Sequence, residues 1–344
     1  MSDLTTLRLG GPARSLTTVT TAAELAAALR AEPAAFVLGG GSNLVVADAG
    51  IDAAVVRIGL PGIDIDGDLV TVGAGVTWDD AVAELVAAGR GGLAPLSGIP
   101  GSAGATPIQN VGAYGTEVAD HLHGVTLLDR GTGELRRVGA ADLRLTYRSS
   151  RLKGRGDAEV VTAVTFRLPV GPAPVRYAEL SRTLGVEPGG SAPGERVREA
   201  VLALRRSKGM VIDPTDPDTR SAGSFFTNPV LDAEQLAVTA AAIAAHCGPE
   251  TGYPRYPAGD GRTKLSAAWL IERAGFTKGF DGPGGRVGLS GKHTLALVNR
   301  HGSTADLLEL AAQVVNRVRE VFAVTLHPEP LLIGVELPAG PAAP

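Results

Sequence analysis

Residues 97–115 read Ser-Gly-Ile-Pro-Gly-Ser-Ala-Gly-Ala-Thr-Pro-Ile-Gln-Asn-Val-Gly-Ala-Tyr-Gly, which is too rich in glycine for a core helix or strand. Glycine has no Cβ, so its N–H can approach a phosphate or a flat ring closely. Pro100 and Pro107 stiffen the turns, and Gln109 and Asn110 add amides that both donate and accept hydrogen bonds. Long segments of this kind inside compact domains are usually functional or disordered, and the apolar side chains here argue against disorder. The segment therefore predicts a ligand-binding loop.

A second glycine-rich segment lies nearer the N-terminus. Residues 34–38 are apolar and predict a short buried strand, which leads directly into Gly39, Gly40, Gly41, Ser42 and Asn43. Consecutive free N–H groups at such a point can bind an anion, and the hydroxyl and amide can donate to the same oxygens. Three glycines alone are equally consistent with a tight turn. The longer loop further along the chain favours a shared ligand site.

Composition limits the classes of function. A chain of 344 residues is expected to form two or three domains, and 44% hydrophobic with 20% charged residues is typical of soluble globular proteins. The formal net charge of -4 argues against a general nucleic-acid surface. Cys247 is the only cysteine, so neither an intrachain disulfide nor a cysteine-based metal cluster can form, and we expect it to be a small apolar side chain in a helix.

Several common signatures are missing from the sequence. Residues 1–9 lack the positive start and apolar run of a secretory signal, and no apolar run reaches about 18 residues, so we expect a cytoplasmic protein without membrane partners. No His/Cys/Glu cluster has metal-ligand spacing, so no metal site is expected. Gly73-Ala74-Gly75 lacks the third glycine of a dinucleotide fingerprint. Any cofactor is therefore expected on a fold other than the doubly wound one.

The apolar patterns predict an α+β protein. Strands are expected at residues 34–38, 44–46, 54–58, 69–72, 125–128, 160–168, 294–298 and 331–335, and helices at 77–88, 197–207, 233–246 and 264–274. Proline and glycine interruptions predict a domain boundary between about residues 170 and 205. The clearest element is a last helix that begins at Ser303 with Asp306 three residues on and has apolar side chains at helical spacing. Residues 338–344 are expected to be a frayed tail.

Three polar groups outside the glycine segments are candidates for chemistry. Arg148 follows an apolar-patterned segment and could hold a carboxylate with its two-pronged guanidinium, although a solvated surface arginine is the more common case. Ser224 and Asn228 flank two adjacent phenylalanines in a chain that has only seven, which makes them candidates for a site. An ordinary turn onto a strand is the alternative interpretation of this segment. Glu329 lies between two prolines, which fix its backbone and could preorganise its carboxylate, whereas an exposed loop glutamate is the default.

Together these segments resemble the UDP-N-acetylenolpyruvoylglucosamine reductase family. The resemblance rests on five elements in family order, which are residues 39–43, residues 97–115, Tyr147-Arg148, residues 223–229 and Pro328-Glu329. It implies an FAD-binding region of the vanillyl-alcohol-oxidase type in two α+β subdomains, followed by an α+β substrate-binding domain. The implied ranges are 1–65 with a C-terminal strand near 326–337, then 66–200, and then 208–325.

The resemblance also implies a reaction. NADPH reduces FAD, NADP leaves, the enolpyruvyl ether of UDP-N-acetylglucosamine takes the same site, and hydride passes from flavin N5 to C3, giving UDP-N-acetylmuramate for peptidoglycan. Arg148 would hold the carboxylate, onto which hydride addition pushes charge, Glu329 would help to polarise the enolpyruvyl group, and Ser224 would protonate C2. Because neither glycine segment contains His or Cys, we expect noncovalent FAD.

The family pattern assigns further residues to binding. For FAD these are Gly39, Gly40, Gly41, Ser42, Asn43, Ser97, Gly98, Ile99, Pro100, Gly101, Gly104, Gln109, Asn110, Gly112, Ala113 and Tyr114. For the UDP-sugar they are Tyr177, Lys208, Asn228, Tyr256 and Lys264, where tyrosine can stack on uracil or bond a phosphate and lysine can meet the pyrophosphate. Residues 175–180 resemble a loop that closes over substrate in one subgroup.

Two other functions stay open at this point. One is an oxidase of the same flavin fold that uses oxygen as acceptor, against which Ser224 and the Arg148/Glu329 pair argue. The other is a noncatalytic binder of flavin or nucleotide sugar, which the loss of any of those three residues would have favoured. We expect a monomer, because no strip of surplus exposed apolar residues is evident.

Overall fold

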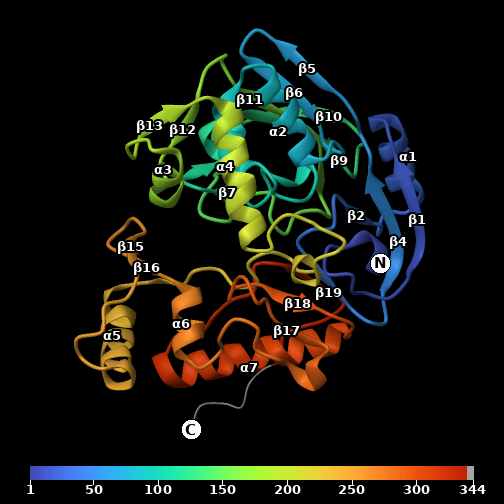
Figure 1. Ribbon diagram of the computed structural model, residues 1–344. Helices are drawn as coiled ribbons and strands as arrows, with labels where there is room; N and C mark the ends of the chain where they lie inside the picture. The colour runs from blue at the N-terminus through green and yellow to red at the C-terminus, as the bar shows by residue number, and fades with distance from the viewer. Residues whose placement is uncertain (339–344) are drawn as a thin grey trace. The chain divides into compact units, whose positions relative to one another are not determined.

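The computed structural model describes residues 1–338 and divides the chain into two compact units (Figure 1). Unit 1 combines residues 1–12, 42–51 and 212 onward, and unit 2 combines residues 13–41 and 52–211. The segment expected to hold a boundary, 170–205, lies inside unit 2, and the three-part division expected from the sequence stays a prediction. The expected tail lies outside the described residues except for Pro338.

Unit 2 is built on a five-stranded antiparallel sheet. Its order is β10 (Leu135–Gly139), β9 (Leu122–Asp129), β11 (Glu159–Arg167), β6 (Leu69–Gly73) and β5 (Ile63–Asp66). Buried and more exposed side chains roughly alternate along β6, as expected for a strand with one face on the core. Helix α2 (Trp78–Ala87) buries Trp78, Ala81, Val82, Leu85 and Val86, which recur at helical spacing.

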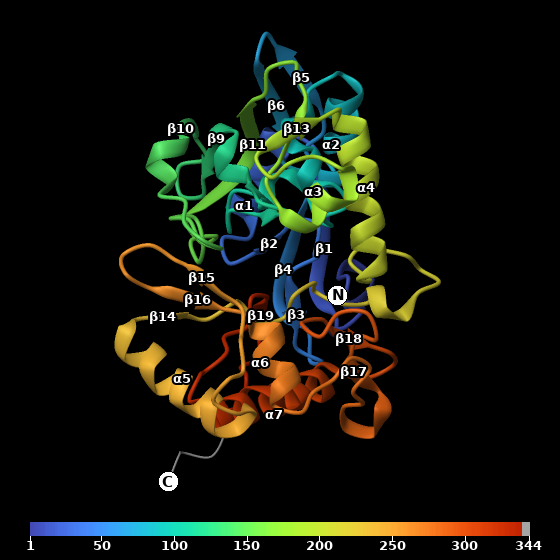
Figure 2. The ribbon, with the colours of Figure 1, turned by 60° about the vertical axis from the view of Figure 1, so that its left-hand side comes forward.

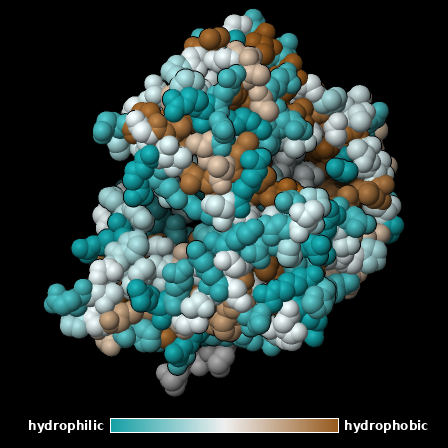
Figure 3. All heavy atoms as spheres, viewed as in Figure 1, coloured by the Kyte–Doolittle hydropathy of each residue, from teal (hydrophilic) through white to brown (hydrophobic). Residues whose placement is uncertain are grey.

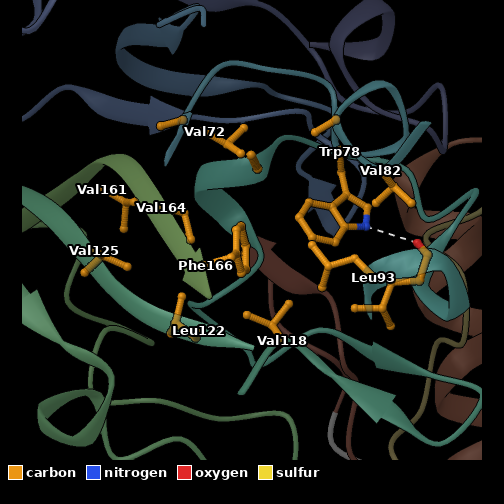
Figure 4. Close-up of a cluster of buried hydrophobic side chains, with 14 of the residues drawn as sticks. Val72, Trp78, Val82, Leu93, Val118, Leu122, Val125, Val161, Val164 and Phe166 are labelled. Atoms are coloured by element: carbon orange, nitrogen blue, oxygen red, sulfur yellow. Dashed lines mark hydrogen bonds between the residues drawn. The ribbon is translucent and has the colours of Figure 1, made fainter. Parts of the chain in front are cut away.

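The core of unit 2 lies between this helix and the sheet (Figure 4). Trp78 and Phe166 of β11 approach with ring centroids 5.8 Å apart, and the indole N–H donates to the carbonyl of Leu96 at 3.1 Å. Both rings are almost fully buried, and replacing either with alanine is expected to cost about 3–5 kcal/mol of stability. This core supports the segment that begins at Ser97.

Smaller elements complete unit 2. Strands β1 (Ala13–Val19), β4 (Ile51–Ile58) and β2 (Phe36–Leu38) form a sheet in that order, and β2 runs parallel to β4. Pairs β12 (Ala173–Val175) with β13 (Gly190–Ala192), and β7 (Gly112–Ala113) with β8 (Thr116–Glu117), are antiparallel. The remaining helices are α1 (Ala22–Ala31), α3 (Ala178–Leu184) and α4 (Gly194–Ser207).

Unit 1 has its own core, which the last helix dominates. Helix α7 (Thr304–Phe322) begins at a capping box of Ser303 and Asp306, and it buries the stripe expected from the sequence. Helices α5 (Ala233–Cys247) and α6 (Ala267–Arg273) pack against it. Cys247 ends α5, half-buried against the apolar core, as predicted.

The strands of unit 1 form three small sheets. Strands β14 (Val230–Leu231), β16 (Thr263–Leu265) and β15 (Arg255–Pro257) lie side by side, and β15 and β16 form one hairpin (Figure 2). Strand β17 (Val287–Leu289) pairs with β18 (Leu297–Asn299). Strand β19 (Leu331–Ile333) pairs in parallel with β3 (Leu44–Val46), so two segments far apart in the sequence share one sheet.

Some sequence-based expectations were wrong. Lys264, expected in a helix over 264–274, lies in strand β16, and the helix starts only at Ala267, because Ser266 caps it. Residues 175–180 do not form a continuous loop, since β12 ends at Val175 and α3 starts at Ala178. The strand expected at 294–298 is shorter and starts at Leu297. Helix α1 and strand β1 were not predicted.

Candidate active site

The two glycine-rich segments touch each other in unit 2. A Cβ on Gly40 would lie 2.5 Å from the Cα of Gly101, and a Cβ on Gly39 would lie 2.8 Å from the Oγ of Ser102. The distance at Gly40 is too short for any side chain against backbone, so glycine is required there, whereas the neighbour of Gly39 is a side-chain hydroxyl that can move. Gly41 and Gly101 also have positive φ angles of 66° and 116°.

The contact presents unpaired backbone donors. Within residues 1–338, no protein acceptor is found for the N–H groups of Gly40, Gly41 and Gly101. Gly41 is buried and Gly101 is half-buried, and backbone N–H groups in such places are normally paired, whereas the N–H of the exposed Gly40 can be satisfied by solvent. Neighbouring free N–H groups form a concavity suited to an anion. The arrangement can therefore bind phosphate oxygens or a flat ring at close range.

Other members of the long segment support its backbone. The N–H of Gly104 donates to the carbonyl of Ala74 at 3.0 Å, and a Cβ there would lie 2.5 Å from the Cβ of Ala74. Ser97 is buried and its hydroxyl donates to the carbonyl of Ala94 at 2.7 Å. Ile99 packs against the core of unit 2. Gly104 and Ser97 thus have clear packing roles that their residue types alone did not reveal.

Asn110 joins the segment to Arg148. Its amide donates to the carboxylate of Glu117 and the carbonyl of Thr146, at 2.8 and 3.1 Å, and its amide oxygen accepts from the N–H of Ala119 at 3.0 Å. The guanidinium of Arg148 donates to the carbonyl of Asn110 at 3.3 Å and to that of Gly112 at 2.7 Å. The structure therefore brings the predicted carboxylate-binding arginine onto the predicted cofactor loop.

The end of the same loop meets two predicted substrate residues. The ring of Tyr114 lies edge-on to that of Tyr177, with centroids 5.6 Å apart, and the Nζ of Lys208 lies 5.9 Å from the Tyr114 centroid. The ammonium of Lys208 donates to Glu179 at 2.7 Å. Burial, the dominant effect, raises the pKa of the Tyr114 hydroxyl, although the nearby charges of Arg205 and Lys208 act in the opposite direction.

In unit 1, Ser224 and Glu329 lie on adjacent backbone segments. The N–H of Glu329 donates to the carbonyl of Phe225 at 2.9 Å, and Phe226 bridges to Pro328. The amide of Asn43 donates to the carbonyl of Glu329 at 3.4 Å, and the N–H of Leu331 donates to that of Asn43 at 2.9 Å. The buried Phe225 and Phe226 fix this arrangement, so the serine and the glutamate share one rigid support.

The remaining predicted substrate residues also lie in unit 1. Tyr256 stands directly opposite Lys264 across the β15–β16 hairpin, which places both side chains on one face. Tyr256 is 51% exposed and is therefore open to a ligand. The amide oxygen of Asn228 accepts from the N–H of Ala267 at 2.9 Å, so Asn228 also stabilises the start of α6.

Comparisons with known proteins agree with the division of the chain into two units. Residues 13–139 match the model of an FAD binding domain, and residues 213–333 match the C-terminal domain of UDP-N-acetylenolpyruvoylglucosamine reductase. A reductase of that name from Saccharopolyspora erythraea is 57% identical, with 98% of this chain and 95% of that protein aligned. One from Nocardia farcinica is 55% identical over 98% of this chain and 89% of its own length. The chain belongs to the UDP-N-acetylenolpyruvoylglucosamine reductase family.

A solved structure extends the match to three dimensions. The UDP-N-acetylenolpyruvylglucosamine reductase of Thermus caldophilus superposes with a TM-score of 0.66 at 28% identity, covering 96% of each chain. The predicted α+β fold with an FAD-binding domain is thereby confirmed, as are FAD as cofactor and an oxidoreductase activity in peptidoglycan precursor synthesis. A noncatalytic flavin binder and an oxygen-using oxidase, the two other functions considered, find no support among these relatives.

The predicted site residues can be located relative to the two matched ranges. Both glycine segments lie inside the FAD-domain match, and Ser224, Asn228, Tyr256, Lys264 and Glu329 lie inside the C-terminal match. Arg148, Tyr177 and Lys208 fall between the two matches. The contacts of unit 2 join Arg148, Tyr177 and Lys208 to the long glycine segment, whereas Ser224 and Glu329 form a separate group in unit 1.

Sequence reasoning missed two residues next to the reductase site. Asp79 accepts the N–H of Gly98 at 2.5 Å, and Glu179 forms the ion pair with Lys208. Neither follows from a motif, because their partners lie far away in the sequence.

Within residues 1–338, no group of three potential ligands is placed to hold a metal ion, and no helix is long and apolar enough to cross a membrane.

Proposed function

We propose that this enzyme uses NADPH to reduce UDP-N-acetylenolpyruvoylglucosamine to UDP-N-acetylmuramate. The observation that carries the proposal is the contact of the two glycine segments, Gly40 against Gly101, on a loop that also holds Arg148 through the carbonyls of Asn110 and Gly112. A cofactor site and a carboxylate-binding group thus share one support. FAD held at this site would supply the hydride chemistry, transfer from NADPH to N5 and from N5 to C3 of the enolpyruvyl group.

The residues present fit FAD. We assign its diphosphate to the open N–H groups of Gly40, Gly41 and Gly101, with the neighbouring residues of 39–43 and 97–101 completing the cradle. Gly104, Gln109, Asn110, Gly112, Ala113 and Tyr114 would form the rest of the binding wall. For Asn110 the assignment concerns the backbone, because its side chain already bonds to Glu117, Thr146 and Ala119. The absence of His and Cys from both segments supports noncovalent binding.

Three side chains carry the chemistry in this proposal. Arg148 binds the substrate carboxylate, onto which charge moves as C3 is reduced, and its guanidinium is already oriented by two carbonyls. Ser224 delivers the proton to C2 from its hydroxyl. Glu329, whose N–H bonds to the carbonyl of Phe225 next to Ser224, polarises the enolpyruvyl group and is a candidate to assist the serine.

The nucleotide-sugar half of the substrate has separate anchors. Tyr177 and Lys208 would meet the nucleotide and its pyrophosphate, close to Tyr114. Asn228, Tyr256 and Lys264 would contact the UDP-sugar from unit 1, the latter two from a single hairpin face. An exposed tyrosine opposite a lysine suits stacking on a base with a phosphate nearby.

The proposal includes three statements about the whole protein. The FAD-binding region comprises two subdomains, residues 1–65 with the β19 strand and residues 66–200, and residues 208–325 bind substrate. The parallel pairing of β19 with β3 supports the first of these. The enzyme acts as a cytoplasmic monomer on small molecules. On the face in Figure 3, groups of hydrophobic residues lie among hydrophilic ones.

Anaerobic stopped-flow absorbance at the flavin band tests the function. The purified protein is first reduced with NADPH and then mixed with UDP-N-acetylenolpyruvoylglucosamine or with buffer. Rapid return of the oxidised spectrum with the substrate alone is the expected result. A protein that binds no FAD, or one that is reoxidised by oxygen and not by the substrate, would contradict the proposal. Repeating the reduction with NADH measures the cosubstrate preference.

A further inference from the structure

One carboxylate outside the predicted site is bonded directly to the long glycine segment. Asp79, in the first turn of α2, accepts the N–H of Gly98 at 2.5 Å. Its two oxygens also accept from both terminal nitrogens of Arg198 in α4, at 2.5 and 2.9 Å. This fork-shaped pairing is the geometry that gives an arginine–carboxylate bond both strength and direction. Asp79 therefore links α2, α4 and the loop.

The loop is also pressed against α4 at this point. Gly98 has a φ of 71°, and a Cβ there would lie 2.8 Å from a methyl of Leu202 and 3.1 Å from one of Val211. Any other residue there would be strained by the positive φ and would have to displace the side chain of Leu202. Gly98 is three residues before Gly101, whose backbone packs on Gly40. A shift at Gly98 would therefore move the backbone that contacts the first glycine segment.

The surroundings keep Asp79 charged. Burial raises the pKa of its carboxyl, but the hydrogen bonds from Arg198 and Gly98 and the positive charges of Arg198 and Arg205 outweigh burial and hold it below the usual value. The guanidinium of Arg205 is deeply buried and donates to the carbonyl of Met210 at 2.8 Å. Asp79 is thus paired with Arg198 and also feels the positive charge of Arg205 on the same helix. A charged acceptor makes the bond from Gly98 stronger than a neutral one would.

We propose that Asp79 is a positioning residue for FAD binding, which fixes the backbone of residues 98–101 by holding the N–H of Gly98 while Arg198 holds its carboxylate. This inference rests on the proposed assignment of that segment to FAD. Without Asp79 the segment would have to be ordered when FAD binds, and the affinity would fall accordingly.

The test is titration of the apoprotein with FAD, followed by flavin fluorescence. Asp79→Ala is expected to raise the dissociation constant of FAD about 10- to 100-fold, the range for loss of a charge-assisted hydrogen bond. Asp79→Asn, which keeps an acceptor for Gly98 but loses the charge, should give a smaller increase. Asp80→Ala is the matched control, because Asp80 is an exposed acid in the same helical turn, and it should leave the dissociation constant unchanged.

A second readout separates positioning from general stability. The visible spectrum of bound FAD should shift in Asp79→Ala measured at saturating FAD and well below the melting temperature, and it should not shift in Asp80→Ala. If Asp79→Ala does not fold, Arg198→Gln, which leaves the bond to Gly98 but releases the carboxylate, is expected to weaken FAD binding about 3- to 10-fold. Wild-type affinity and spectrum in Asp79→Asn and Arg198→Gln would overturn the inference. Failure of the wild-type protein to bind FAD would instead overturn the proposed function.

Discussion

The backbone segments that carry Ser224 and Glu329 are joined by a hydrogen bond from the N–H of Glu329 to the carbonyl of Phe225 at 2.9 Å. If Ser224 delivers the proton to C2, Ser224→Ala should leave reduction by NADPH unchanged and slow reoxidation by the substrate about 10²- to 10⁴-fold, the usual contribution of a positioned acid. Stopped-flow measurement of the two half-reactions checks this. Ser224→Cys, which keeps an ionisable proton, is the control and should recover part of the rate. Equal slowing of both half-reactions would rule out the assigned role.

Glu179 occupies the ammonium of Lys208, at 2.7 Å, and both side chains are about one-third exposed. If Lys208 binds a pyrophosphate, the two anions compete for it. Glu179→Gln is therefore expected to tighten binding of UDP by up to about 5-fold, consistent with a partly exposed ion pair. Isothermal titration calorimetry measures the change. The exposed Glu187→Gln serves as a comparison, and weaker binding of UDP to Glu179→Gln would show that the carboxylate orients the lysine.

Residue identity alone did not distinguish ligand contacts from internal ones. Asn110 looked like an amide that faces the ligand, yet its amide bonds to Glu117, Thr146 and Ala119 within the protein. Gly104 was predicted from its motif, but the contact that excludes a side chain there is with Ala74. Such partners depend on how distant strands and loops meet. A glycine motif therefore predicts the neighbourhood of a site better than the atoms that face the ligand.

Asp306, in the first turn of helix α7, anchors the start of that helix. Asp306 accepts from the N–H and hydroxyl of Ser303, both at 2.9 Å, and from the Nε of Arg286 at 3.0 Å. The hydrogen bond from Arg286, followed by those from Ser303, holds the pKa of this carboxyl well below its usual range. The unfolded chain therefore binds a proton at a higher pH than the folded chain does, so stability falls as the pH falls.

This linkage gives a prediction for acid unfolding. The contribution of Asp306 should be complete above about pH 5 and should be lost progressively as the pH falls below the unfolded pKa of about 3.9. Asp306→Asn should cost about 1 kcal/mol near pH 7 and show a shallower loss of the free energy of unfolding on acidification. Denaturant titrations between pH 7 and pH 3 measure both. Asp260→Asn, in the turn between β15 and β16, is the control. The prediction is contradicted if the free energy of unfolding falls equally steeply with pH in the wild type and in Asp306→Asn, or if Asp260→Asn shows the same shallower loss as Asp306→Asn.

Elements were predictable where a start signal and a long periodic pattern coincided. Helix α7 has both, and its bounds agree closely with the sequence. Lys264 was placed in a helix because the alanines and apolar residues after it continue at helical spacing, whereas its own backbone pairs with Tyr256 and Val230. Helix α1 was missed although Thr21 and Glu24 form a complete capping box. Its alanine-rich sequence carries little amphipathic signal in a chain rich in alanine throughout.

For the whole molecule, FAD should act as a stabilising ligand. A ligand that binds only the folded state adds RT ln(1 + [L]/Kd), which is about 2.7 kcal/mol at a concentration 100 times Kd. Scanning calorimetry of the apoprotein with increasing FAD should therefore show a melting temperature that rises with the logarithm of the concentration. Riboflavin, which lacks the diphosphate assigned to the open N–H groups, should produce a much smaller rise. An equal effect of both compounds would show that the diphosphate contributes little.

The parallel pairing of β19 with β3 has a consequence for how the protein is made. Residues 44–46 leave the ribosome early, but their partner strand, residues 331–333, is synthesised only near the end. At about 5–20 residues per second, β3 waits tens of seconds for a neighbour. During that time unit 2, whose residues end at 211, can already fold. The nascent chain would thus carry a folded unit 2 together with an apolar, unpaired strand, and such a strand is a binding target for chaperones during translation.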